Sequence, residues 1–127
     1  NIGKSVEADL TKVRQEVLKI ANYSGLQPKL MIFEHNSVNE NVVKYIEAQT
    51  VDPEDVIIFF FSGHGYRTES KKENLWPNPY FTPIKKGVDF NQITNILREK
   101  KGRLLIAIAD CCNNVMEEAY APPLLKK

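Results

Sequence analysis

A histidine and a cysteine are the side chains of this sequence best suited to chemistry, because each closely follows a run of apolar residues. His64 stands between two glycines directly after residues 56–62, of which six are large apolar or aromatic residues. Cys112 follows a second run, residues 103–109, which is apolar after its first residue. A nearby imidazole is the usual group that turns a thiol into a nucleophilic thiolate near neutral pH. The two residues therefore suggest nucleophilic catalysis by a cysteine.

Both apolar runs predict strands, since short runs of β-branched and aromatic residues fit a strand buried on both faces better than a helix. The carboxyl ends of parallel strands are where α/β proteins bind ligands and carry out chemistry. If the two strands are parallel neighbours, His64 and Cys112 leave the sheet at the same edge. Gly65 then lets a backbone N–H approach a substrate carbonyl as one oxyanion-hole donor, and the amide of Cys112 is the expected second donor.

The rest of the chain alternates helical with strand patterns, which predicts an α/β fold with a mainly parallel sheet flanked by helices. Apolar spacings of three and four predict a helix over residues 5–24, and Asp89 has the position of a cap for another. Residues 29–34 predict a strand, and residues 37–40 have the form of a capping box for the helix that follows.

Two segments carry weaker patterns. Prolines and aromatic residues predict that residues 66–87 form a long irregular loop with its own packing. Residues 115–120 suggest a helical turn, and residues 120–127 a loosely packed linker. The first expected element is a helix, although a doubly wound domain normally begins with a strand. We therefore expect an unpaired edge beside the strand at 56–62, where a strand is missing or is supplied by a partner.

The composition is that of an ordinary globular protein, and 127 residues fit one domain. A net charge of +1 implies neither a nucleic-acid nor a membrane partner, and the apolar runs are far shorter than the roughly 18 residues of a membrane helix. The only two cysteines are adjacent, a poor arrangement for a structural disulfide, so we expect a reducing, cytoplasmic location. Because the chain opens with Asn1, we expect it to be part of a longer one.

Two motifs together resemble a known family. Residues 62–65, Ser-Gly-His-Gly, and residues 110–114, Asp-Cys-Cys-Asn-Asn, resemble the large-subunit region of the caspase and metacaspase superfamily of cysteine peptidases. The 48 positions from His64 to Cys112 match the spacing of about 50 that is typical of caspases. The resemblance implies a single caspase-like catalytic domain over residues 1–127, with the three-layer sandwich of that family. It also implies that His64 is the general base and Cys112 the nucleophile.

The resemblance extends to substrate choice through Asp110. Caspases have glutamine at this position and cut after aspartate, whereas metacaspases have aspartate and cut after arginine or lysine. A carboxylate pairs with a cationic side chain and repels an anionic one, so Asp110 implies a substrate with arginine or lysine before the scissile bond. The loop after His64 carries lysines in place of the clustered acids that bind calcium in many metacaspases. No metal and no other cofactor is therefore expected.

The expected partners are a protein or peptide substrate and the missing small-subunit segment. From the resemblance, we expect the family's first strand and the segment after the nucleophile to lie outside this sequence, so the chain by itself could be inactive. The alternative is a catalytically inert caspase-fold scaffold or protein-interaction domain. In that case His64 is a structural histidine, Cys112 a buried thiol and Asp110 a turn cap. A nucleotide-binding α/β domain is disfavoured, because no G-x-x-x-x-G-K or G-x-G-x-x-G motif is present.

Overall fold

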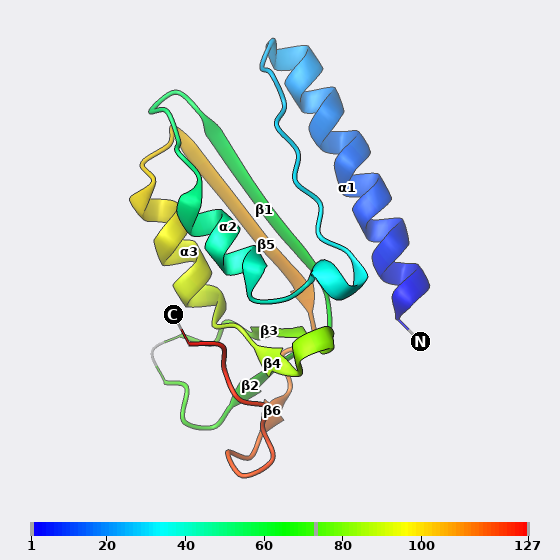
Figure 1. The fold of residues 1–127 in the computed structure, drawn as a ribbon, viewed down its shortest axis with the longest axis vertical. Coiled ribbons are helices and arrows are strands. Elements are labelled where there is room, and N and C mark those ends of the chain that lie inside the picture. The colour runs from blue at the N-terminus through cyan, green and yellow to red at the C-terminus, as the bar shows by residue number, and fades with distance from the viewer. Residues whose placement is uncertain (1, 73, 127) are drawn as a thin grey trace. The chain divides into compact units, whose positions relative to one another are not determined.

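The computed structural model describes residues 2–72 and 74–126. Across these ranges the chain forms three α-helices, two short 3-10 helices and six strands, drawn in Figure 1. The chain divides into two compact units, one up to Phe33 and one from Glu34 onward. Each unit is described by itself below.

The first unit contains the helix α1 (Gly3–Ser24), which confirms the helix expected over residues 5–24. Gly25 ends it in the left-handed conformation, with φ of 70°, which is readily available to glycine. The strand expected at 29–34 is not formed, so that expectation was wrong. Leu30, Met31 and Ile32 are 40% to 53% exposed. An apolar run becomes a strand only where a neighbouring strand accepts its hydrogen bonds, and local sequence does not supply that neighbour.

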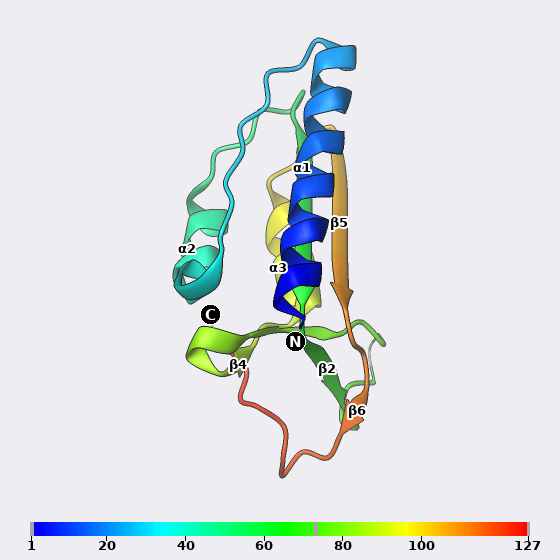
Figure 2. The same cartoon turned by 90° about the vertical axis from the view of Figure 1, so that its right-hand side faces the viewer.

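The second unit is organised around a parallel pair of long strands, β1 (Val56–Gly63) and β5 (Leu104–Cys111). Both coincide closely with the apolar runs expected to be strands. The helices α2 (Asn41–Ala48) and α3 (Phe90–Glu99) lie on one side of this pair (Figures 1 and 2). The α/β class is thus confirmed, although the parallel pair is only a two-stranded sheet.

The expected cap is confirmed at α3, whereas the capping box expected before α2 is wrong. Asp89 caps α3 as expected, since its side chain accepts a hydrogen bond from the backbone N–H of Asn91 at 2.9 Å. The expected capping box at residues 37–40 is not formed. The hydroxyl of Ser37 instead accepts from the N–H of Glu34 at 2.8 Å, around the 3-10 helix His35–Ser37. A serine can bond to backbone on either side, so the motif alone does not decide which turn it closes.

The β1–β5 sheet is open on one face and at its edges. Leu104, Ile106 and Ile108 alternate along β5 and are between 40% and 50% exposed, so the expectation of strands buried on both faces was wrong. Of the strands that the structure describes, β5 is the only one paired with β1, which confirms the expected unpaired edge.

A second sheet lies beyond the carboxyl ends of β1 and β5 (Figure 1). Its strand order is β4-β3-β2-β6, and only the β2–β6 pair is parallel. The strands are β2 (Gly65–Thr68), β3 (Asn78–Phe81), β4 (Lys86–Gly87) and β6 (Val115–Met116). The segment expected to be an irregular loop, residues 66–87, thus contains most of this sheet, and its residue Phe81 is only 1% exposed.

The C-terminal segment is fastened to this second sheet. The hydroxyl of Tyr66 donates to the carbonyl of Pro122 at 2.8 Å. Gly87 and Leu124 form a parallel bridge, in which the N–H of Leu125 donates to the carbonyl of Gly87 at 2.8 Å. The linker expected over residues 120–127 is thus wrong for Pro122 to Leu125, which are bonded to this sheet, although Tyr120 is 76% exposed and residue 127 lies outside the described residues.

The helical turn expected over residues 115–120 is formed in part. Val115 and Met116 are the strand β6, whereas the N–H groups of Tyr120 and Ala121 donate to the carbonyl of Glu117 at 3.0 and 3.1 Å. The sequence did not reveal the pairing of the C-terminal segment because its partners, Tyr66 and Gly87, lie far away along the chain.

Candidate active site

The register of the parallel pair brings His64 and Cys112 to one edge of the sheet. Pairing runs in step from Val56 beside Leu104 to Gly63 beside Cys111, where both strands end. His64 follows the end of β1 and Cys112 follows the end of β5, the neighbouring strand, and both residues are exposed. The expected placement at the same edge of the sheet is observed.

The backbone from the carbonyl of His64 onward is held by the second sheet. The carbonyl of His64 accepts a hydrogen bond from the N–H of Tyr80 at 2.9 Å. Gly65 then begins β2 and lies tightly against the cysteine pair. A Cβ atom at Gly65 would lie 2.5 Å from Sγ of Cys111 and 2.6 Å from the carbonyl oxygen of Cys112. Only glycine permits this approach, so the segment after His64 and the residue Cys112 are in direct contact.

The two adjacent thiols have different surroundings. Cys111 is half-buried beneath Gly65, whereas Cys112 is exposed. Burial raises the pKa of the Cys111 thiol to about 11, with further contributions from the negative charges of a Cys112 thiolate and of Asp110. Cys111 therefore remains a protonated thiol near neutral pH and is a poor nucleophile. Of the two sulfurs, that of Cys112 is the better placed to react.

Asp110 lies two residues before Cys112, beside Ser62 in the register of the sheet. It continues the alternation of exposed residues along β5 and is itself exposed. Among the residues that the structure describes, it forms no ion pair. Its carboxylate is consequently available to a cationic group that approaches this edge.

Two hydrogen bonds fasten the chain after Cys112, and the sequence pattern did not reveal them. The side-chain amide of Asn113 donates to the carbonyl of Leu75 at 2.6 Å. The carbonyl of Asn114 accepts from the N–H of Arg67 at 2.8 Å. The polar residues after the cysteines were visible in the sequence. Their partners lie 38 and 47 positions earlier, so no local pattern could have identified them.

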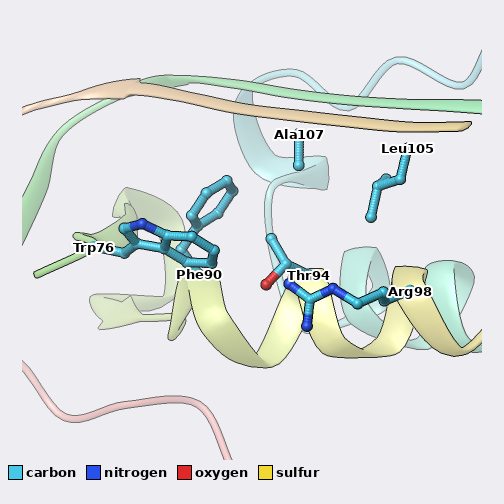
Figure 3. A pocket seen from close by; sticks show the side chains of 6 residues that line it. All are labelled: Trp76, Phe90, Thr94, Arg98, Leu105 and Ala107. Atoms are coloured by element: carbon cyan, nitrogen blue, oxygen red, sulfur yellow. The ribbon is translucent and has the colours of Figure 1, made fainter. Parts of the chain in front are cut away.

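A pocket of about 410 Å³ lies between α3 and β5 (Figure 3). Leu105 and Ala107 point from β5 toward α3, which contributes Phe90, Thr94 and Arg98, with Trp76 at one end. The pocket does not contain the residues singled out for chemistry. It marks the place where the α3 side of β5 is incompletely covered.

Neither a metal centre nor a membrane span is evident in residues 2–72 and 74–126. Within them no three histidine, cysteine or acidic side chains are grouped so that they could hold a metal ion. No helix in the same ranges is both long and apolar enough to cross a membrane.

Comparison with protein families matches residues 29–123 to the caspase domain. This range covers most of the chain. It contains the parallel strands β1 and β5, the helices α2 and α3, and every candidate site residue. The chain therefore belongs to the caspase domain family, a family of cysteine peptidases with peptide substrates. Comparisons with curated proteins and with solved structures gave no match.

Proposed function

We propose that this chain is the catalytic domain of a caspase-type cysteine endopeptidase, in which His64 is the general base and Cys112 the nucleophile. The register of β1 and β5 carries the proposal, because it delivers one imidazole and one exposed thiol to the same strand ends. The raised pKa of the Cys111 thiol supports Cys112 as the reactive one of the pair. Membership of a cysteine peptidase family makes this the reaction that best fits the two groups.

In the proposed reaction, the imidazole of His64 accepts the thiol proton of Cys112 as sulfur attacks the scissile carbonyl carbon. The backbone N–H groups of Gly65 and Cys112 stabilise the oxyanion that forms. The imidazolium then donates its proton to the departing amine, leaving a thioester on Cys112. Water, activated by the same imidazole, hydrolyses the thioester and restores the thiol. The approach of Gly65 to the carbonyl of Cys112 supports this assignment, since it places the two proposed donors on touching segments.

For substrate choice, we propose that Asp110 recognises arginine or lysine before the scissile bond. The carboxylate is exposed, lies two residues from the proposed nucleophile and, across residues 2–72 and 74–126, has no ion-pair partner. A cationic substrate side chain would supply that partner. The negative charge also disfavours a thiolate at Cys112, so the imidazole of His64 has to compensate for it.

We further propose that residues 1–127 are one caspase-like domain of a longer protein and work with a small-subunit segment that completes a three-layer sandwich. The free edge of β1 and the open apolar face at Leu104, Ile106 and Ile108 support this. Exposed strand edges are normally paired or covered, because they otherwise promote aggregation. The two free thiols fit a reducing compartment, and we propose the cytoplasm.

The direct test is covalent labelling of the longer parent protein with a peptide electrophile that ends in arginine. We expect labelling at Cys112 that is lost in Cys112→Ala and at least roughly tenfold slower in His64→Ala, because the imidazole generates the thiolate. Cys111→Ala is the matched control and should label at the parent rate. Labelling at Cys111, or labelling of Cys112 that does not depend on His64, would refute the His–Cys assignment.

A non-catalytic scaffold is the second candidate, and the open apolar face of β5 favours it. Half-exposed Leu104, Ile106 and Ile108 form a contiguous strip of the kind that marks protein–protein contacts. The same labelling experiment separates the two functions. A parent protein that binds partners but never reacts at Cys112 would be a scaffold.

A further inference from the structure

The loop between β2 and β3 carries a lysine whose side chain is largely withdrawn from solvent. The side chain of Lys71 is only 11% exposed, and its ammonium donates to Oδ1 of Asp89 at 3.0 Å and to the carbonyl of Trp76 at 2.7 Å. An ammonium removed from water is stable only where it is paired and hydrogen-bonded, and here it has both kinds of contact. The two contacts therefore hold Lys71 and Trp76 of this loop. Since Asp89 also caps α3 through the N–H of Asn91, the loop is attached to the start of that helix.

A second contact joins the same loop to the same helix end. The rings of Trp76 and Phe90 meet edge to face, with centroids 5.5 Å apart and an angle of 60° between their planes. Figure 3 shows the indole of Trp76 beside the ring of Phe90 at the start of α3. The N–H of Trp76 also donates to Oδ1 of Asn74 at 3.0 Å. The residue after Leu75 is thus held by its backbone and by its ring.

Leu75 of the same loop contacts Asn113, the residue that follows the proposed nucleophile. The carbonyl of Leu75 accepts the 2.6 Å hydrogen bond from the side-chain amide of Asn113. On its other side Asn113 is joined to Cys112, which no described side-chain bond holds and which extends into solvent. The carbonyl of Leu75 therefore holds the backbone just after Cys112 through Asn113, beside the hydrogen bond that Arg67 donates to Asn114.

We propose that Lys71 and Asn113 are positioning residues for the nucleophile: the Lys71–Asp89 ion pair places the carbonyl of Leu75, and Asn113 uses that carbonyl to orient Cys112. The inference rests on the proposed function, because it concerns the alignment of Cys112 with His64. Neither residue contacts the reacting atoms. A displacement of about 1 Å at reacting groups can cost roughly a hundredfold in rate, so the loss of one hydrogen bond in this network should change the rate strongly.

The test uses the active parent protein and steady-state kinetics on a peptide amide that ends in arginine. Lys71→Met keeps the length of the side chain but removes its charge and donors. Asn113→Asp keeps the shape but replaces the donating amide. We expect each to lower kcat by roughly tenfold to a hundredfold with KM changed by less than about threefold, the pattern of an alignment that is lost in the transition state. Lys71→Arg should recover most of the rate, because it restores a charged donor.

Two comparisons distinguish positioning from general damage. Lys72→Met removes an exposed neighbouring charge and should leave kcat unchanged, and thermal unfolding shows whether each variant is folded. If Lys71 acts through the acceptor of Asn113, the double variant should be no slower than the slower single one, since effects along one pathway do not add. An unchanged kcat in folded single variants, or fully multiplicative losses in the double, would overturn the inference alone. A parent protein that never reacts at Cys112 would overturn the proposed function together with it.

Discussion

The two sheets of the second unit differ in a way that their sequences conceal. The strands β1 and β5 are long and almost entirely apolar, yet alternate residues of β5 remain about half exposed. The strands β2, β3 and β4 are short and interrupted by proline and lysine, yet Phe81 and Val88 nearby are 1% exposed. Apolar content therefore does not report burial in this chain. The long pair leaves one apolar face open to solvent, whereas the short sheet encloses Phe81 almost completely.

The largest difference between the sheets should appear in stability. Phe81→Ala removes a fully buried ring from the short sheet and should lower the free energy of unfolding by about 3–5 kcal/mol. Ile106→Ala on the open face of β5 should cost less than about 1.5 kcal/mol, because a half-exposed side chain has lost only part of its hydration. Urea unfolding of both variants measures the two values. Equal costs would mean that the open face is covered in solution.

The junction of the two sheets should tolerate no extra atom at Gly65. In Gly65→Ala, the added methyl group would meet Sγ of Cys111 and the carbonyl of Cys112 at about 2.5 Å, so β2 must move away from β5. Overpacking of this kind costs about 1–3 kcal/mol, which urea unfolding would register. We also expect slower labelling of Cys112 by the arginyl electrophile. Gly25→Ala is a useful contrast, since nothing lies near its Cβ position and only backbone strain is introduced. Labelling as fast as in the parent would exclude a role for this contact in the site.

The specificity proposal predicts a selective loss at the same junction. Asp110→Asn keeps the shape of the side chain but removes its charge, so kcat/KM for arginyl substrates in the parent protein should fall by at least roughly tenfold, about 1.4 kcal/mol. Reaction of Cys112 with a small uncharged alkylating agent should hold or rise, because a nearby negative charge is gone. Equal losses of both would indicate that Asp110 supports the backbone. Undiminished cleavage after arginine would place the specificity carboxylate elsewhere.

The attachment of the C-terminal segment to the short sheet should weaken when the hydroxyl of Tyr66 is removed. Tyr66→Phe removes the hydroxyl that donates to the carbonyl of Pro122 and should cost about 1 kcal/mol. The amide of Leu125, which bonds to Gly87, should then exchange faster with deuterium. Exchange that stays at the parent rate would show that the Gly87 pairing alone holds this segment to the short sheet.

A last expected effect is a loss of stability at alkaline pH. Burial raises the pKa of Cys111 from 9.0 to about 11, so the folded state holds this proton more tightly than the unfolded state does. The stabilisation is fully present below pH 9 and is lost as the pH rises toward 11. Urea midpoints measured across this window should fall less in Cys111→Ala than in the parent chain. Identical pH profiles would mean that the Cys111 thiol is more open to solvent than the junction suggests.

Features with a local signal were predictable. The two strands follow from runs of β-branched and aromatic residues, the end of α1 from Gly25, and the cap of α3 from Asp89. The failures share one cause. The strand expected at 29–34 and the loose C-terminal segment were judged without knowing which distant residues could accept their hydrogen bonds. Backbone donors must be satisfied somewhere in the fold, but the place is a property of the tertiary structure.

By itself, the sequence determined the chemical groups of the candidate site and the fact that each follows an apolar strand. It also determined the family motifs at His64 and Cys112. Only the tertiary structure decided that the two strands pair in parallel, with Gly63 beside Cys111, and that Cys111 is buried while Cys112 is exposed. Only it joined Asn113 to the loop held by Lys71. Residue type and spacing are local properties, whereas register, burial and long-range hydrogen bonds depend on which segments pack together, so they arise only when the whole chain folds.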